Sequence, residues 1–144
     1  MSNPNTDMLK VALSNIFVLY VKTLNYHWHM KGDNFYENHI LLQKQYESLA
    51  ETIDELAERI VIYGEKAPGS MTEYLKLAII KEADGSKADA NSMIMELAED
   101  HTTLTNNLLK AIESKTLDPI TEDIFIQQVQ AHTKNAWMLK SCKK

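Results

Sequence analysis

The side chains best suited to metal binding lie in one stretch of the chain, residues 25–63. This stretch contains three of the five histidines and a group of carboxylates. Most of it has the apolar spacing of one long helix. Successive residues of a helix turn by about 100°, so side chains at suitable spacings share a face about 100° wide. The ligand-type residues on this face are His39, Gln43, Glu47, Asp54 and Glu58.

Two pairs on this face have a spacing that suits metal binding. Asp54 and Glu58 are four residues apart, so their carboxylates can hold one cation between them. His39 and Gln43 form a second such pair. The two pairs are separated by about 22 Å of helix. They therefore cannot bind the same ion within one chain.

Antiparallel pairing of this helix with its own copy would bring the two pairs together. A two-fold axis near Ser48 would place the histidine end of one chain against the carboxylate end of the other, which makes two identical sites. His27, at the end of the preceding helix, could complete the histidine half. Imidazole mixed with carboxylate suits Fe(II), Mn(II) or Zn(II) better than a structural zinc site. The predicted ligands are His27 and His39 of one subunit with Asp54 and Glu58 of its mate.

Each half of this site also has an ordinary structural explanation. Carboxylates four residues apart often form a solvated helix face, and a histidine near a helix end often has only a structural role. The usual di-iron signature inside a four-helix bundle is Glu-x-x-His on two helices. No Glu-x-x-His occurs in this sequence. This absence favours a site between subunits over a site inside one bundle.

The elements that would position these residues are four long helices. A flexible tail is expected over residues 1–6 and a single domain over residues 7–144. The expected helices span residues 7–32, 34–63, 86–112 and 118–140, with a short helical patch over residues 71–80. The long connection before the third helix favours an all-α, ferritin-like four-helix bundle with a crossover. An up-down bundle with an inserted lid is the alternative.

Composition and charge limit the classes of function. The chain of 144 residues has a formal net charge of −5, which does not favour attraction to nucleic-acid phosphate. The single cysteine, Cys142, excludes an internal disulfide. The N-terminus lacks a basic segment followed by an apolar run, and the most apolar run is too short to span a membrane. A cytoplasmic protein is therefore expected.

Two motif blocks, H-W-H-M-K-G-D-N-F and D-E-L-A-E-R-I, contain the pattern His-x11-His…Asp-x3-Glu. The chain closely resembles the Dps family, the DNA-binding proteins from starved cells or mini-ferritins, over residues 9–140. This resemblance implies a hollow homododecamer that oxidises Fe(II), preferably with hydrogen peroxide, at sites between two-fold-related subunits. The ferric product would be stored inside the shell. The implied iron ligands are His27 and His39 of one subunit and Asp54 and Glu58 of the other.

Three residues near this site need separate interpretation. The family commonly places Asp or Glu where this chain has Gln43, which keeps one acceptor oxygen but loses the charge. One of the two iron positions is therefore expected to be weaker, with Glu47 as a substitute ligand or a surface residue. The resemblance places Trp28 beside the site, where it would intercept stray oxidising equivalents. Core packing is the alternative for Trp28.

Two further properties of the family can be compared with these residues. In the family, acidic side chains near the start of the last helix line a pore through which iron enters the shell. The candidates here are Asp118, Glu122 and Asp123, with compensation of the helix dipole as the alternative. DNA-binding members often carry a lysine-rich N-terminal tail, and residues 1–8 contain no Lys or Arg. A nucleoid-associated protein that binds and protects DNA is the alternative function, and DNA binding is not expected. No function is assigned to His29, His101 or His132.

Overall fold

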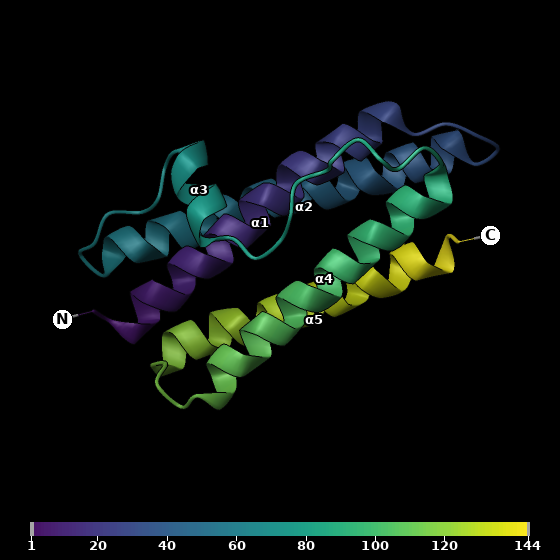
Figure 1. Ribbon diagram of the computed structural model, residues 1–144. Helices are drawn as coiled ribbons and strands as arrows, with labels where there is room; N and C mark the ends of the chain where they lie inside the picture. Colours follow the sequence, from purple (N-terminus) through teal and green to yellow (C-terminus); the bar gives the residue numbers. More distant parts are fainter. Residues whose placement is uncertain (1, 144) are drawn as a thin grey trace.

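The computed structural model describes residues 2–143, which contain five helices and no strand; Met1 and Lys144 lie outside the described residues. Helices α1 (Pro4–His29) and α2 (Phe35–Ile62) form one antiparallel pair, and α4 (Ala90–Glu113) and α5 (Pro119–Ser141) form a second. Helix α3 (Met71–Leu77) lies in the connection between the pairs. This connection runs from one end of the bundle to the other, so α2 and α4 point in the same direction (Figure 1). The ferritin-like bundle is confirmed, and the up-down alternative is wrong.

The core lies where the apolar faces of the four long helices meet. Phe125 of α5 and Leu97 of α4 pack into it with Leu42 of α2, and each is 1% exposed or less. Leu13 contributes from α1. Trp28 shares the spacing of this buried face but is 64% exposed, so the alternative of core packing within the chain is wrong. No helix of the described residues is long and apolar enough to cross a membrane.

Local capping chemistry sets the helix ends that were predicted correctly. The Asp118 carboxylate accepts a hydrogen bond from the Thr121 amide at 2.8 Å, and Pro119 follows as the first residue of α5. Gly64 has a φ of +87° and follows the last turn of α2. Its amide donates to the Val61 carbonyl at 2.8 Å, which is a common way for a helix to end.

The start of α1 is three residues earlier than the expected start at Asp7. Asn3 caps the helix, because its side-chain oxygen accepts from the Asn5 amide at 2.9 Å. Pro4 fits the first turn, where an amide has no intrahelical partner. The hydroxyl of Thr6 donates to Glu65, which docks this first turn against the end of α2. Residues 4–6 are thus helical.

Three other boundaries also differ from expectation. Helix α1 ends at His29 rather than at Gly32, and Gly32 instead occupies the turn with a φ of +112°. Helix α4 begins at Ala90 rather than at residue 86, because the Asp89 carboxylate accepts from the Ser92 amide at 2.8 Å. Helix α3 ends at Leu77, before the expected residue 80. The Ala78 amide still donates to the Tyr74 carbonyl, but the amides of Ile79 and Ile80 donate instead to the Asn15 side chain of α1, at 2.7 and 3.2 Å.

A buried ion cluster attaches α1 to α4 and to the crossover. The Lys22 ammonium is 3% exposed and lies 2.6 Å from a Glu96 oxygen and 2.7 Å from an Asp100 oxygen. It also donates to the Lys81 carbonyl at 2.9 Å. Burial raises the pKa of Asp100, and the hydrogen bond from Lys22 opposes that rise. The charges of the cluster stabilise one another, and together they hold α1 against α4 and the crossover.

Candidate metal centre

The two predicted histidine ligands lie at the turn between α1 and α2, where they hold each other in place. Their ring planes are 14° apart, with centroids separated by 3.7 Å. The Nδ1 atom of His27 donates to the His39 carbonyl at 2.8 Å, and the Nδ1 atom of His39 donates to the His27 carbonyl at 2.8 Å. A carbonyl oxygen can only accept, so each Nδ1 must carry the proton. In the neutral rings both Nε2 atoms therefore keep a lone pair for a metal ion.

Aromatic neighbours limit the movement of the two rings. Phe35 stacks on His39 with centroids 4.9 Å apart, and Tyr46 packs its ring at 71° to His27 with centroids 5.1 Å apart. His27 is 6% exposed and His39 is half-buried. A ligand whose other nitrogen is hydrogen-bonded and whose ring is packed is held ready for coordination.

Gln43 and Glu47 follow His39 at successive turns of α2. The amide nitrogen of Gln43 donates to a carboxylate oxygen of Glu47 at 2.9 Å. Gln43 is half-buried and Glu47 is exposed. The amide nitrogen of Gln43 faces Glu47, so the Oε1 atom of Gln43 points away from Glu47.

The carboxylate half of the predicted site lies further along the same helix. Asp54 and Glu58 are both exposed on α2. Among residues 2–143 no group of three or more His, Cys, Asp or Glu side chains is arranged to hold a metal ion. One chain therefore brings the two histidines together but does not bring the carboxylates to them. The four-residue ligand set stays a prediction.

The three candidate pore residues differ in their surroundings. Asp118 caps α5 and accepts hydrogen bonds from the Thr121 amide and the Tyr63 hydroxyl, which hold the pKa of its carboxyl below the ordinary value. The position of Asp118 at the start of α5 therefore fits the alternative role, compensation of the helix dipole. Asp123 is exposed and accepts from Gln127 at 2.9 Å, and Glu122 is half-buried. The pore assignment stays a prediction.

A second histidine pair, to which no function is assigned from the sequence, lies buried between α4 and α5. The Nδ1 atoms of His101 and His132 are 2.9 Å apart, and the rings are 0% and 1% exposed. His132 Nε2 donates to Gln128 Oε1 at 3.0 Å, so its Nδ1 accepts the proton of His101 Nδ1. Burial lowers the pKa of His132 to about 4 and that of His101 well below 6.5, with a further contribution from His132. Both histidines occupy inward-facing helix positions. This position is the only signal in the sequence that could have pointed to the pair.

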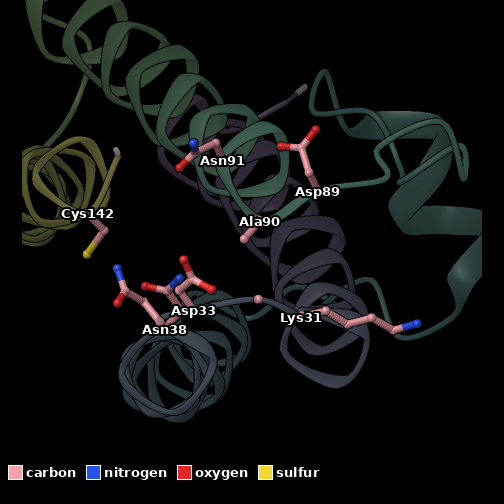
Figure 2. Close-up of a pocket in the computed structure, with 9 residues that line it drawn as sticks. Lys31, Asp33, Asn38, Asp89, Ala90, Asn91 and Cys142 are labelled. Carbon is pink, nitrogen blue, oxygen red and sulfur yellow. The ribbon is translucent and has the colours of Figure 1, made fainter.

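A pocket of about 300 Å³ lies beyond the α1–α2 turn, at the start of α4 and the end of α5. Figure 2 shows Asn38 and Cys142 facing this space, whereas Lys31 points away. Burial raises the pKa of the Cys142 thiol. A protonated thiol is a poor nucleophile and a poor metal ligand. This pocket is therefore a weaker candidate for a reactive site than the histidine pair.

Comparisons with known proteins cover nearly the whole chain. The Ferritin-like domain family matches residues 6–143. DNA protection during starvation protein 2 of Bacillus anthracis is 31% identical over 94% of this chain and 93% of that protein. Dps from Staphylococcus aureus is 36% identical, with a TM-score of 0.90 over 95% of this chain and 93% of that chain. Dps from Vibrio cholerae, described as a ferritin-like diiron-carboxylate protein, is 31% identical, with a TM-score of 0.88 over 95% of this chain and 87% of that chain.

Proposed function

Because the chain belongs to the Dps family of ferritin-like proteins, we propose that it stores iron by oxidising Fe(II) at sites shared between two subunits. The observation that carries this proposal is the reciprocal hydrogen bonding of His27 and His39, which leaves both Nε2 atoms available to a metal ion. Such bonds fix the tautomer that a ligating histidine needs. The diiron-carboxylate description of the Vibrio cholerae relative supports iron as the metal.

The missing half of each site would come from Asp54 and Glu58 of a two-fold-related subunit. Antiparallel pairing of α2 is supported by the apolar side chains left uncovered at its two ends. Phe35 and Tyr36 at the start are 40% and 69% exposed, and Ile62 at the end is 67% exposed. Apolar side chains that gather into one exposed patch often mark an interface, and antiparallel pairing would bring these two ends together. Pairing about a two-fold axis would cover both ends at once and complete two sites.

Iron is the substrate in this proposal, and hydrogen peroxide is the oxidant. Two Fe(II) ions each give up one electron, and one peroxide takes both electrons with two protons and leaves as two water molecules. A two-electron reduction of peroxide avoids the hydroxyl radical that a one-electron reduction releases. The ferric product would be stored inside a shell of twelve chains, in the cytoplasm. Zn(II) and Mn(II) fit the same mixture of imidazole and carboxylate ligands.

The first test is stopped-flow oxidation of Fe(II), added under anaerobic conditions and followed by peroxide. Asp54→Asn and Glu58→Gln should each slow the oxidation about tenfold or more, since even supporting residues of metal sites have effects of that size. Glu55→Gln is the matched control, because Glu55 is an exposed neighbour on α2 that turns about 100° away from Asp54. Equal rates for the control and for the Asp54 and Glu58 variants would refute the ligand assignment.

A mixing experiment tests whether two chains share each site. Assemblies of His39→Ala chains alone, and of Asp54→Asn chains alone, should each keep at most about a tenth of the wild-type activity. When they are produced together, a mixed pair has one site with both changes and one intact site, so part of the activity should return. Mixing His27→Ala with His39→Ala is the control, because both changes then fall in the histidine half and no intact site forms. If the first mixture is as inactive as the control, the shared site is wrong.

Protection of DNA is the second candidate function, since the Bacillus anthracis relative carries that name. The net charge of −5 opposes it. The first turn of α1 is also docked rather than extended, because the Asn5 side chain accepts from the Asp118 amide at 2.8 Å. We therefore expect no retardation of duplex DNA in a gel at moderate salt. Tight binding that weakens steeply with added salt would favour the DNA-protecting role instead.

A further inference from the structure

The interior of the bundle holds a group of buried polar side chains that the proposed metal centre does not use. Gln45 of α2 is 3% exposed, and His101 and Thr105 of α4 are 0% and 6% exposed. Among residues 2–143, seven buried side-chain nitrogen or oxygen atoms have no hydrogen-bond partner, and four of the seven belong to these three residues. Buried polar atoms of folded proteins nearly always have a partner. The four atoms, Oε1 and Nε2 of Gln45, Nε2 of His101 and Oγ1 of Thr105, therefore need a partner from outside the chain.

The contacts of α1 place these three side chains at one level of the bundle. Tyr46, the residue after the buried glutamine, packs its ring against Tyr20 of α1 with centroids 6.2 Å apart. Two residues further along α1, the Lys22 ammonium lies 2.7 Å from a carboxylate oxygen of Asp100, the residue before the buried histidine. The threonine follows about one turn later on the same side of α4. Because all three side chains are buried at this level, they point into the same part of the interior.

The hydrogen-bonding properties of the group define the ligand that it fits. His101 donates its Nδ1 proton to Nδ1 of His132, so its Nε2 atom can only accept. The hydroxyl of Thr105 and the amide of Gln45 can each donate and accept. The group supplies no negative charge that would stabilise a buried cation. It therefore fits a small uncharged molecule that both donates and accepts hydrogen bonds, and water is the molecule of this kind that buried polar groups usually bind.

Thr105 also connects this part of the interior with the surface. It lines a groove of about 420 Å³ between α4 and α5, whose walls include Thr102, Thr133 and Trp137. His101 lies about one turn before Thr105 on the same helix. The groove therefore gives a water molecule from the solvent a short path to the buried group.

We propose that Gln45, His101 and Thr105 bind at least one internal water molecule, which joins α2 to α4 across the interior of the bundle. The water donates to Nε2 of His101 and to Oε1 of Gln45, and it accepts a hydrogen bond from the hydroxyl of Thr105. Three partners are typical of a buried water. This site is separate from the proposed metal centre and does not depend on iron oxidation. Its role is to hold α2, the helix that carries most of the predicted ligands, against the α4–α5 pair.

A crystal structure of the assembled wild-type protein, at a resolution that shows ordered water, tests the site directly. Density for a water should lie within about 3.2 Å of Nε2 of His101 and of a side-chain atom of Gln45. A direct hydrogen bond between Gln45 and His101 would overturn the proposal, because the two side chains would then need no ligand. Absence of density within this distance of Nε2 of His101 would overturn it as well.

Urea unfolding tests the bridge in solution. The proteins compared are the wild type, Gln45→Leu, Thr105→Val and the double variant, all at one protein concentration. Gln45 and Thr105 make no hydrogen bond to each other, but they share the proposed water. Each single change removes one partner of this water, so the second change should cost less when the first is already present. The double variant should therefore lose less free energy of unfolding than the sum of the two single losses.

The control cycle combines Gln45→Leu with Ser14→Ala. Ser14 of α1 is also fully buried, but its hydroxyl donates to the Lys10 carbonyl at 2.8 Å, and it lies about two turns before Lys22. The losses of this control pair should add, as they do for distant and independent sites. If the cycle of Gln45 and Thr105 is as additive as the control, no water joins the two side chains and the proposal is wrong.

Discussion

The buried pair of His101 and His132 should make the protein lose stability as the pH falls from 6.5 towards 4. The pKa of His132 is lowered from 6.5 to about 4 in the folded chain because the ring is buried. Between these values the unfolded chain binds a proton that the folded chain cannot bind, so acid favours unfolding. The loss begins below the unfolded pKa and is complete below the folded pKa. At 1.36 kcal/mol for each pKa unit, His132 alone accounts for about 3 kcal/mol.

The assay is urea unfolding at a fixed protein concentration, with the stability measured at several pH values between 7 and 4. A fixed concentration matters because assembly contributes to the apparent stability. His132→Gln removes the titrating ring and keeps an oxygen that can accept from His101 Nδ1. The variant should show a shallower loss on acidification, by about 3 kcal/mol over this range. His29→Gln is the control, because it makes the same substitution at an exposed histidine.

Carboxylates also take up protons in this range, but they are the same in the wild type and in both variants. The difference between the curves therefore reports the ring of His132 together with the contribution that His132 makes to the pKa of His101. If the curves of the wild type and His132→Gln stay parallel from pH 6.5 to 4, the folded protein tolerates a proton on this pair. The argument that burial keeps His132 neutral would then be wrong.

Two further predictions concern the fold. Lys22→Met leaves Glu96 and Asp100 without their buried cation, so it should lower the free energy of unfolding by about 3–5 kcal/mol in urea titrations. A loss below about 1 kcal/mol, the range of exposed pairs, would contradict the buried cluster. Gly64→Ala should cost about 1 kcal/mol, because φ is +87° while the added Cβ meets no atom within 4 Å. Gly69→Ala is its control, since Gly69 does not have a left-handed φ, and equal losses would refute the backbone explanation.

Sequence alone predicted the parts of this fold that depend on neighbouring residues. Asp118 followed by Pro119 starts α5, and Gly64 follows α2, because these residues satisfy helix ends locally. The start of α1 differs from the expectation because Pro4, three residues before Asp7, belongs to the helix and not to a tail. It fits the helix because Asn3 caps the turn and Thr6 docks on the end of α2. Docking of that kind depends on residues far away in the sequence.

The polar groups of the interior could not be predicted for the same reason. Lys22 fits a buried position only because Glu96 and Asp100 of α4 reach it. The spacing of residues within α1 does not predict that contact. The pairing of His101 with His132 likewise depends on the register between two helices. For the candidate site, the spacing of the ligand-type residues along one helix already ruled out one shared ion within a single chain, and the pairing of two chains stays a prediction. The direction of the His27 and His39 nitrogens came only from the structure.

The reciprocal bonds of His27 and His39 also limit how the site can be redesigned. Each ring supplies an N–H to the backbone carbonyl of the other residue, so each supports the other as well as being a proposed ligand. Aspartate at either position would bring a carboxylate, which has no proton to donate, against a carbonyl oxygen. Two acceptors would then face each other, and the stacked partner would lose its neighbour. An exchange of imidazole for carboxylate is therefore expected to fail at either position, and changing both residues does not help, because each ring bonds the backbone carbonyl of the other residue and not its side chain.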